Sequence, residues 1–449
     1  MEDIIVEEKL LQLLENKQFH ELKNELLELN NYDIADFIVD LPAESAIVVF
    51  RLIHKDDAAE VFSNLETETQ EYIIGSVTDQ ELNAIMADMY IDDAVDMLSE
   101  LPANMVKKVL KNSSPSDRAI INQFLNYPEN STGSIMTAEF IDLKKHMTVS
   151  DAIKRVRKLG EDSVDLYTCY VVDDSKKMEG VVNLRELLLA DDGAKIEDLM
   201  SMDVIHAKTS DDREETARVM MNYDFTALPV VDTENRLVGI VTIDDVIDVI
   251  EEEATEDFEK MAAMAPSEKP YLKTSIWALS KNRIFWLLVL MLSATVTGLV
   301  LGHNEAVFAA VPALVTFMPM LTDTGGNAGS QSSTMVIRGM AIGEIELTDF
   351  PKVLAKEFGV SVLVGLALSI VNFIRIVLMY PGQYVMATVV CIALFATVIM
   401  AKTVGGLLPI GARALKVDPA IMSAPLITTI VDTLALMLYF SIAKAMLPL

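Results

Sequence analysis

A single carboxylate stands inside a long apolar stretch of the sequence. Asp432 lies in the middle of SAPLITTIVDTLALMLYF, and a helix would place Thr428 and Thr429, one turn earlier, on the same face. A charge in a membrane-spanning helix is costly unless it faces a water-filled path. We therefore expect Asp432 to line a path for cations, although a lone aspartate can also act as a structural hydrogen-bond partner.

A second polar segment, DTGGNAGSQSSTMVIRG, begins at Asp323 and interrupts another apolar stretch. Its glycines would allow the backbone to open, and non-helical backbone at membrane depth is tolerated where it lines a cavity. Oxygen atoms that could contact a cation follow at Asn327, Ser330, Gln331, Ser332 and Ser333. The segment is therefore expected to face the same path as Asp432. The basic residues Arg375 and Lys402 are equally consistent with helix ends or with the membrane interface.

These residues need membrane-spanning elements to position them, and five apolar stretches are candidates: residues 285–302, 306–322, 357–379, 384–411 and 419–446. Each approaches or exceeds the roughly 20 residues that a spanning helix needs, although the second is short unless it continues past Gly326. Five such stretches in series disfavour buried helices of a large soluble protein. With a cytosolic N-terminus, five spans would place the C-terminus outside. Flanking basic residues support this orientation, since only Arg375 and Lys444 fall on the external side.

Charge divides the chain into two parts of different chemistry. Of its 449 residues, 36 are basic and 67 are acidic, which gives a formal net charge of −31. Residues 285–449 contain eight of each kind, so the excess lies in residues 1–284, with 28 basic and 59 acidic side chains. Such an acidic part should repel nucleic acid and attract cations. Because MEDIIVEEKLL lacks a basic region followed by an apolar one, we expect no cleaved signal and a cytosolic location for this part.

Residues 1–130 contain an internal repeat of amphipathic segments: DIADFIVDLP from Asp33, DAAEVFSNL from Asp57 and DAVDMLSELP from Asp93. Repeated helix pairs stack on one another and bury a shared apolar core. The sequence therefore predicts an α-helical, solenoid-like domain at this end of the chain.

A tandem repeat of about 60 residues follows from about residue 135. IMTAEFIDLKKHMTVSDAI is echoed by LMSMDVIHAKTSDDREETA, and YVVDDSKKMEGVVNLRELL by PVVDTENRLVGIVTIDDVI. The alternation of strands and helices resembles a pair of CBS modules, which commonly pack together and can bind adenine nucleotides. Thr242 and Asp245 match the ribose-contacting Thr-x-x-Asp of those modules, whereas Asn183 and Glu186 stand there in the first copy. Helix capping is the alternative role for Thr242 and Asp245.

An acidic helix is expected from about residue 244 to 265, directly before the apolar part. Like charges at one-turn spacing destabilise a helix, and no basic stretch of matching size is present to neutralise them. Either the charged face is solvated or divalent cations bind to it. Oxygen ligands favour Mg²⁺, Ca²⁺ or Mn²⁺ over Zn²⁺ or Cu²⁺. One Asp432 per chain suits a hydrated Mg²⁺ that a symmetric dimer surrounds.

In this order, the parts resemble the MgtE family of magnesium transporters over nearly the full length. The motifs that carry the resemblance are GGNAGSQSSTMVIRG at 325–339 and DPAIMSAPLITTIVDTLALMLYF at 418–440. The resemblance implies a multidomain membrane protein: an α-helical repeat domain at 1–130, an α/β CBS pair at 131–198 and 199–250, an acidic plug helix at 244–272, and a transmembrane domain of five helices at 273–449. It also implies a homodimeric Mg²⁺ channel in the cell membrane, rather than an enzyme, with its pore on the two-fold axis.

The resemblance assigns roles to particular residues. The pore carboxylate falls on Asp432, and the pore-facing polar segment runs from Asn327 to Gln331. With the helix face described above, this predicts Asp432, Asn327 and Thr428 as metal ligands, and Ser330, Gln331 and Thr429 as pore-lining residues. The implied ligands of regulatory Mg²⁺ are acidic: Asp92, Asp96, Asp212, Asp224, Asp244, Asp248, Glu252, Glu256 and Asp418. Two departures stand out, since many members read Gly-Asn-Gln in place of Gly329-Ser330-Gln331 and Ser-Gly-Pro in place of Ser423-Ala424-Pro425.

The expected mechanism couples the acidic part to the pore. At low cytosolic Mg²⁺ the acids repel one another and the pore opens, whereas at high Mg²⁺ bridging ions favour a compact, closed arrangement. No P-loop is present, so ATP bound at Thr242 and Asp245 would act as a regulator. The alternatives are a cation exchanger of related membrane fold and a non-conducting, CBS-type membrane sensor. Asp432 disfavours the sensor, because a mere anchor needs no charge within a span.

Overall fold

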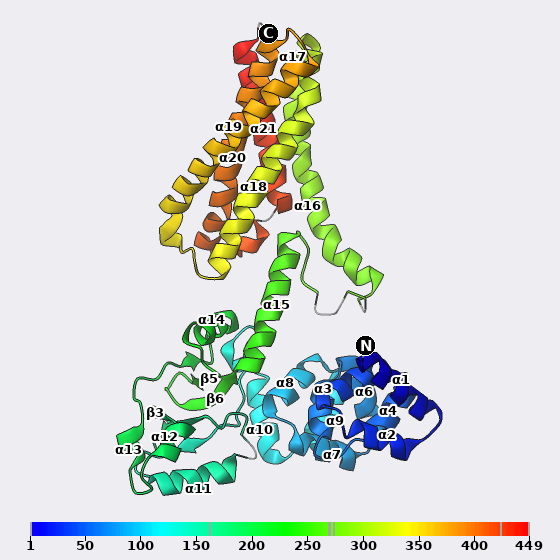
Figure 1. Ribbon diagram of the computed structural model, residues 1–449, viewed down its shortest axis with the longest axis vertical. Helices are drawn as coiled ribbons and strands as arrows, with labels where there is room; N and C mark the ends of the chain where they lie inside the picture. The colour runs from blue at the N-terminus through cyan, green and yellow to red at the C-terminus, as the bar shows by residue number, and fades with distance from the viewer. Residues whose placement is uncertain (1, 161–162, 268–270, 273, 423, 448–449) are drawn as a thin grey trace. The chain divides into compact units, whose positions relative to one another are not determined.

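The structure is a computed structural model that describes residues 2–160, 163–267, 271–272, 274–422 and 424–447 (Figure 1). The chain forms two compact units, residues 1–250 and 251–449. Residues 268–270 of the expected plug segment and Ser423 of the second departure lie outside the described residues.

The N-terminal unit begins with ten short helices: α1 (Glu2–Glu15), α2 (Phe19–Leu26), α3 (Asn31–Val39), α4 (Ala43–Phe50), α5 (Ala58–Ser63), α6 (Thr67–Ser76), α7 (Asp79–Asp88), α8 (Ile91–Glu100), α9 (Ala103–Asn112) and α10 (Pro115–Phe124). Capping residues set several of their starts; the Thr78 hydroxyl, for example, accepts from the Glu81 N–H in a capping box. The three repeated segments of the sequence coincide with α3, α5 and α8. Their apolar faces share one buried core, in which Ile38 of α3 and Phe62 of α5 are fully enclosed.

The two α/β copies follow with the same topology. Copy one contains the 3₁₀ turn η1 (Thr132–Ser134), β1 (Asp142–Leu143), α11 (Val149–Leu159), β2 (Thr168–Val172), β3 (Met178–Asn183), α12 (Leu184–Leu189) and α13 (Ile196–Leu199). Copy two contains β4 (Ala207–Lys208), α14 (Arg213–Tyr223), β5 (Ala227–Val231), β6 (Leu237–Thr242) and the long helix α15 (Ile243–Met261). Each sheet has three strands, the first parallel and the third antiparallel to the central strand.

The copies also match in detail, which confirms the tandem repeat. A register irregularity falls between Val171 and Val172 in one sheet and between Val230 and Val231 in the other. A bulge at equivalent sites of both strands is a designed feature of a fold and not an accident of one copy.

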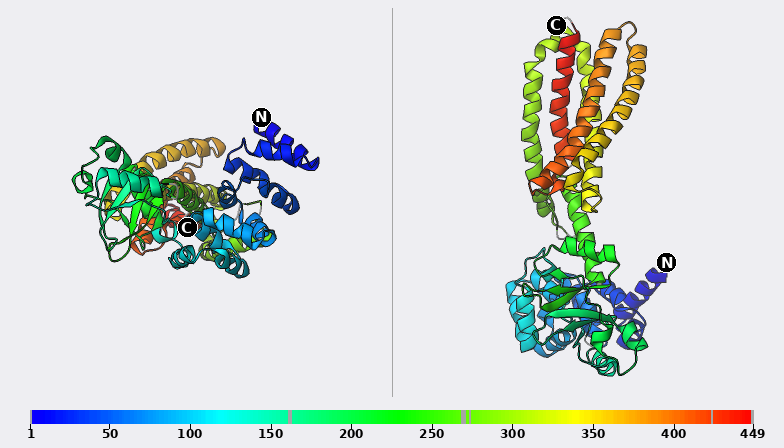
Figure 2. Two further views of the ribbon diagram at one scale, coloured as in Figure 1. Left: turned by 90° about the horizontal axis from the view of Figure 1, so that it is seen from below. Right: turned by 90° about the vertical axis from the view of Figure 1, so that its left-hand side faces the viewer.

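The second unit is helical and contains the apolar part of the chain. It holds α16 (Ile276–His303), α17 (Glu305–Ala310), η2 (Pro312–Phe317), α18 (Met318–Ala341), η3 (Leu347–Asp349), α19 (Phe350–Met379), α20 (Tyr384–Ala414), η4 (Pro419–Ile421) and α21 (Ala424–Met446). The long helices run side by side, and α18 packs along both α20 and α21 (Figure 2). The unit has its own buried core, centred on α18, α20 and α21.

The expected second span at 306–322 is wrong. These residues form α17, η2 and only the start of α18: Pro312 begins η2, and Pro319 lies in the first turn of α18, where proline is tolerated. Within the described residues, four helical segments are long and apolar enough to cross a membrane: Ile276–His303, Leu347–Met379, Tyr384–Ala414 and Ala424–Met446. Helix α18 has the length but is more polar, so the total of five spans stays a prediction.

Candidate functional site

Helix α18 carries the polar segment, and its glycines bring helices together instead of opening the backbone. The helix is continuous from Met318 to Ala341, so the expected opening at Gly325, Gly326 and Gly329 is wrong. A Cβ on Gly326 would lie 2.8 Å from Thr428 Cγ2 on α21. Small residues of this kind let membrane helices approach closely. The glycines therefore bring α18 close to the helix that carries Asp432.

Asp432 is half-buried on α21, and the threonines one turn earlier are tied to their own helix. The Thr428 and Thr429 hydroxyls both donate to the Pro425 carbonyl oxygen, each at 2.9 Å. A hydroxyl that donates its proton keeps its lone pairs for a cation or a water molecule. The expected shared face of Asp432 and Thr428 is thus compatible with contact to a hydrated ion.

A second carboxylate, Asp323 on α18, belongs to the same region and was not among the residues predicted from the sequence. It lies close enough to Asp432 for the two carboxylates to repel each other. Asp323, Asn327 and Gln331 are exposed and follow one another at four-residue spacing, so they form one face of the helix. That spacing was the signal that could have revealed Asp323. We refer to Asp323, Asn327, Gln331 and Asp432 as the polar face.

The serines of the segment do not all share this face. The Ser330 Oγ is buried and has no hydrogen-bond partner within the described part of the chain. Ser332 and Ser333 are buried among the helices: the Ser332 hydroxyl donates to Glu357 Oε2 at 2.5 Å, and that of Ser333 donates to the Met422 carbonyl oxygen at 2.5 Å. Neither of the latter two is placed to serve as an oxygen ligand beside Asn327.

Lys402 and Arg375, the basic residues for which the sequence suggests a helix end or the membrane interface, differ in the structure. Lys402 is buried in the middle of α20, so neither a helix end nor the membrane interface describes it. Arg375 is exposed near the end of α19 and donates to Met320 Sδ at 3.0 Å, which fits a helix-end role.

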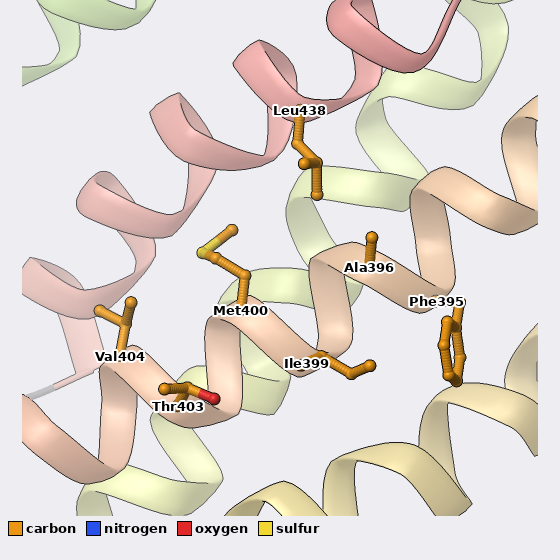
Figure 3. A pocket seen from close by; sticks show the side chains of 7 residues that line it. All are labelled: Phe395, Ala396, Ile399, Met400, Thr403, Val404 and Leu438. Carbon is orange, nitrogen blue, oxygen red and sulfur yellow. The ribbon is translucent and has the colours of Figure 1, made fainter. Parts of the chain in front are cut away.

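The described residues of one chain do not form a ready-made metal cage. Among the described residues, no three His, Cys, Asp or Glu side chains converge closely enough to hold an ion. A groove of about 440 Å³ runs along α20 and α21, but its lining is almost entirely apolar: Phe395, Ala396, Ile399, Met400, Thr403, Val404 and Leu438 (Figure 3). A hydrated cation would find no ligands there, so the polar face is the better candidate for a cation path.

The N-terminal unit contains an acidic cluster where the starts of α8 and α15 meet. Its members are Asp92, Asp93, Glu139, Asp244 and Asp245, which interact electrostatically with one another. The Ile91 N–H donates to Glu139 Oε1 at 3.2 Å, which fixes that carboxylate beside the start of α8. Asp92 and Asp244 were expected as ligands of regulatory ions. Asp93, Glu139 and Asp245 were not expected in this role, because only the tertiary fold brings them there.

Burial and mutual repulsion raise the pKa values within this cluster. The pKa of Asp92 rises to about 8, first through desolvation and then through the charges of Asp245 and Asp93. Desolvation also raises the pKa of Asp93 to about 6 and that of Asp245 to about 7. Burial and repulsion therefore disfavour the charged form of these carboxyls, and a bound cation would favour it.

These shifts predict that the protein is more stable at acidic pH. A carboxyl whose pKa is higher in the folded state contributes stability that is complete below its unfolded pKa, about 4, and is lost as the pH rises through its folded pKa. Without divalent cations, the melting temperature of the N-terminal unit in the full-length protein should fall by at least about 4 °C between pH 5 and pH 8.5. Asp92→Asn should reduce this fall. The exposed Asp203→Asn should leave it unchanged, and an identical profile for Asp92→Asn and the wild type would contradict the prediction.

Most of the other acids that were expected to bind regulatory Mg²⁺ lie on α8 and α15 or at the ends of α14. Asp96 stands one turn after Asp92 on α8, whereas Asp248, Glu252 and Glu256 continue at four-residue spacing along α15. Asp212 caps α14, where its Oδ1 accepts from the Glu214 N–H at 2.8 Å, and Asp224 ends that helix in the left-handed region with φ of 54°. Neither residue of α14 belongs to the acidic cluster.

Two of the expected metal ligands, Asp418 and Glu256, form ion pairs with the same lysine side chain. The Lys260 Nζ lies 2.6 Å from Asp418 Oδ2 and 2.6 Å from Glu256 Oε1. Asp418 also caps η4, where its Oδ1 accepts from the Ala420 N–H at 2.8 Å. Because a lysine occupies the position between these carboxylates, Mg²⁺ would have to displace it there.

Thr242 and Asp245 contact each other at the start of α15. The Thr242 hydroxyl donates to Asp245 Oδ2 at 2.5 Å, and Asn183 and Glu186 form a capping box at the same place in the first copy. Both copies therefore use this pair at a helix start, as the capping alternative predicts.

Comparison with known proteins places these features in a family. Residues 318–442 match the family model described as "Divalent cation transporter", residues 29–130 match the MgtE intracellular N domain, and residues 133–193 and 196–252 match the CBS domain. The chain is 37% identical over 432 residues to the magnesium transporter MgtE of Thermus thermophilus, covering 95% of each chain. It is 33% identical to that of Bacillus subtilis, covering 97% of this chain and 96% of the relative. The chain belongs to the MgtE family.

Solved structures of MgtE proteins agree with this membership. The soluble part of a magnesium transporter superimposes with a TM-score of 0.52 at 31% identity, covering 56% of this chain and 99% of the other. The cytosolic domain of the Mg²⁺ channel MgtE, solved in complex with ATP, has a TM-score of 0.51 at 35% identity and covers 54% of this chain and 98% of the other. The expected fold class is thereby confirmed: a helical N-terminal domain, a CBS pair and a helical C-terminal part with candidate membrane helices. The exact domain limits stay predictions.

The membrane match of the MgtE family includes the polar face. Asp323, Asn327, Gln331 and Asp432 all fall within residues 318–442. The family is one of transporters, and several helices of this chain have the length and apolar character of membrane spans. A membrane anchor would not need the residues of the polar face, and these residues lie in the part of the chain that matches the transporter model.

Proposed function

We propose that this protein is a Mg²⁺-selective, channel-type transporter that mediates magnesium uptake across the cell membrane. The observation that carries the proposal is the polar face: Asp323 of α18 lies near Asp432 of α21, and Asn327 and Gln331 continue the exposed polar row along α18 within the apolar part of the chain. Relatives that cover nearly the whole chain are named magnesium transporters. The chemistry agrees, since carboxylate and amide oxygens suit a hard divalent cation.

The cation path is proposed to form between two copies of the chain. One polar face supplies two carboxylates, which is too few for a cage, whereas two faces around a two-fold axis supply four. Mg²⁺ loses its water reluctantly, so a ring of carboxylate, amide and hydroxyl groups would contact the ion through its hydration shell. In this arrangement the N-terminal unit lies in the cytosol and the C-terminus outside.

The acidic cluster is proposed to sense cytosolic Mg²⁺. At low Mg²⁺ its carboxylates are desolvated and repel one another, two effects that both raise their pKa values, and the arrangement of α8 against α15 is disfavoured. Bound Mg²⁺ would supply the missing positive charge and favour the compact, closed state. ATP would act as a second regulator in the CBS pair near Thr242 and Asp245, since the cytosolic domain of a related channel was solved with ATP.

Uptake by the purified full-length protein in liposomes tests this function. With Mg²⁺ outside only, Mg²⁺ should enter down its gradient without a proton or Na⁺ gradient and without ATP. High Mg²⁺ on the side of the N-terminal unit should suppress this entry. Uptake that requires a counter-gradient would instead favour a cation exchanger, and the absence of uptake under all gradients would favour a non-conducting sensor.

A further inference from the structure

A lysine is buried among the helices of the membrane part. Lys402 on α20 is only 5% exposed, and its neighbours along the chain are mostly apolar. A charged group in a membrane span is costly unless it is paired or faces water, and such residues usually have a function. The role of Lys402 therefore depends on the groups that pair with it.

The partners of Lys402 form a relay across three helices. The Lys402 Nζ donates to Ser332 Oγ of α18 at 3.3 Å. The Ser332 hydroxyl in turn donates to Glu357 Oε2 of α19 at 2.5 Å. A serine hydroxyl can donate once and still accept, so it fits between an ammonium group and a carboxylate. The relay has a positive and a negative end, so it adds no net charge to the membrane part.

The packing around the relay leaves little room for its members to rearrange. A Cβ on Gly406 would lie 3.2 Å from Glu357 Cγ, so α20 passes close to that carboxylate. A Cβ on Gly329, one turn before Ser332, would lie 3.1 Å from the Ala401 carbonyl oxygen. Helices α18 and α20 therefore meet closely beside the hydrogen bond that joins Lys402 to Ser332.

The relay lies on a different side of α18 from the polar face. Ser332 is buried, whereas its neighbour Gln331 and Asn327, one turn before Gln331, are exposed. Successive residues of a helix point about 100° apart, so the direction in which Ser332 is held decides where Gln331 and Asn327 point. A hydrogen bond between membrane helices needs one particular direction of the side chain, so the bonds of Ser332 favour one rotation of α18.

We propose that Lys402 and Glu357, acting through Ser332, are positioning residues that fix the rotation of α18 and so present its polar face to the transported divalent cation. The inference rests on the proposed function, because the polar face has its role only in transport. It concerns different residues from those that touch the ion. The relay holds the alignment of α18, and the buried Lys402 charge needs the half-buried Glu357 to balance it.

Charge-matched variants of the full-length protein test the proposal in two measurements, thermal unfolding in detergent and Mg²⁺ uptake into liposomes. Lys402→Met leaves the half-buried Glu357 charge without its partner, and Glu357→Gln does the same to the buried Lys402, so both should lower the melting temperature and reduce uptake at least tenfold. The double variant leaves no unpaired charge, so its melting temperature should recover. Its maximal uptake should remain at least tenfold below that of the wild type, because the rotation of α18 is no longer fixed. For the same reason, its half-saturating Mg²⁺ concentration should shift at least threefold.

Ser332→Ala removes the hydroxyl that joins the two ends and leaves both charges without that hydrogen bond, so it should lower the melting temperature and reduce uptake at least tenfold. Ser361→Ala is the matched control, because Ser361 is also a fully buried membrane serine but its hydroxyl donates only within α19, to the Phe358 carbonyl oxygen at 2.7 Å. It should keep uptake within twofold of the wild type. Wild-type uptake by the double variant or by Ser332→Ala would overturn the proposal. Failure of the proposed function would look different, as absence of Mg²⁺ uptake by the wild type itself, and would overturn both.

Discussion

Asp432→Asn should lower Mg²⁺ uptake into liposomes by at least about 100-fold while leaving the protein folded. The substitution keeps the size of the side chain but removes the charge that Asp432 brings to the polar face. At the effective dielectric of a partly buried site, one unit charge a few ångströms from a cation is worth several kcal/mol. A loss of about 3 kcal/mol corresponds to about 100-fold in occupancy. Initial rates of Mg²⁺ entry, normalised to the amount of reconstituted protein, measure this effect.

A second acidic residue of the same unit provides the control for Asp432. Glu305 is exposed at the start of α17 and lies outside the polar face, so Glu305→Gln should retain uptake within about twofold. Asp323→Asn should fall between the two, because Asp323 acts together with Asp432 but is more exposed. If Asp432→Asn transports like Glu305→Gln, the polar face is not the cation path.

The parts of the site that could be predicted are those set by one segment of chain. The placement of Asp432, Thr428 and Thr429 follows from helical periodicity alone, and the structure keeps them on one helix, α21. The tandem α/β repeat was predictable for a similar reason, because each copy contains its own alternation of strands, turns and helix. Local patterns are visible in a sequence since they need no knowledge of the neighbours.

The parts that could not be predicted depend on contacts between distant segments. The sequence does not show that Ser332 lies between Lys402 and Glu357, residues that stand 70 and 25 positions away from it. The same holds for Asp93, which joins Asp245 only when α8 and α15 pack. Charge at these sites looked like ordinary surface charge, because acidic residues are usually solvated.

The glycines of α18 show how one residue type can be misread. Glycine is compatible both with an opened backbone and with close helix packing, and α18 uses only the second. Composition could not decide between the two, because the deciding fact is which side chains stand opposite. Thr428 stands opposite Gly326, and the backbone of Gly329 stands opposite Gly405.

Among alanine substitutions at the glycines of α20, Gly405→Ala should destabilise the membrane part most. A Cβ on Gly405 would overlap the Gly329 carbonyl oxygen and lie 2.8 Å from its carbonyl carbon. These are backbone atoms of α18, so no side chain can turn aside to make room. Helices α18 and α20 must therefore separate, which costs about 3 kcal/mol or more for an overpacked site. We expect a lower melting temperature in detergent and loss of most Mg²⁺ uptake.

Gly411→Ala separates this effect from the general consequence of replacing a helical glycine. Gly411 lies on the same helix, α20, but a Cβ there would meet no atom within 4 Å. Alanine favours a helix over glycine by up to about 1 kcal/mol, so this variant should be neutral or slightly more stable and should transport normally. If both variants behave alike, α18 and α20 do not approach through Gly329 and Gly405. If only Gly405→Ala fails, the close contact between these helices is required to hold the polar face in place, since Gly329 lies one turn or less from both Asn327 and Gln331.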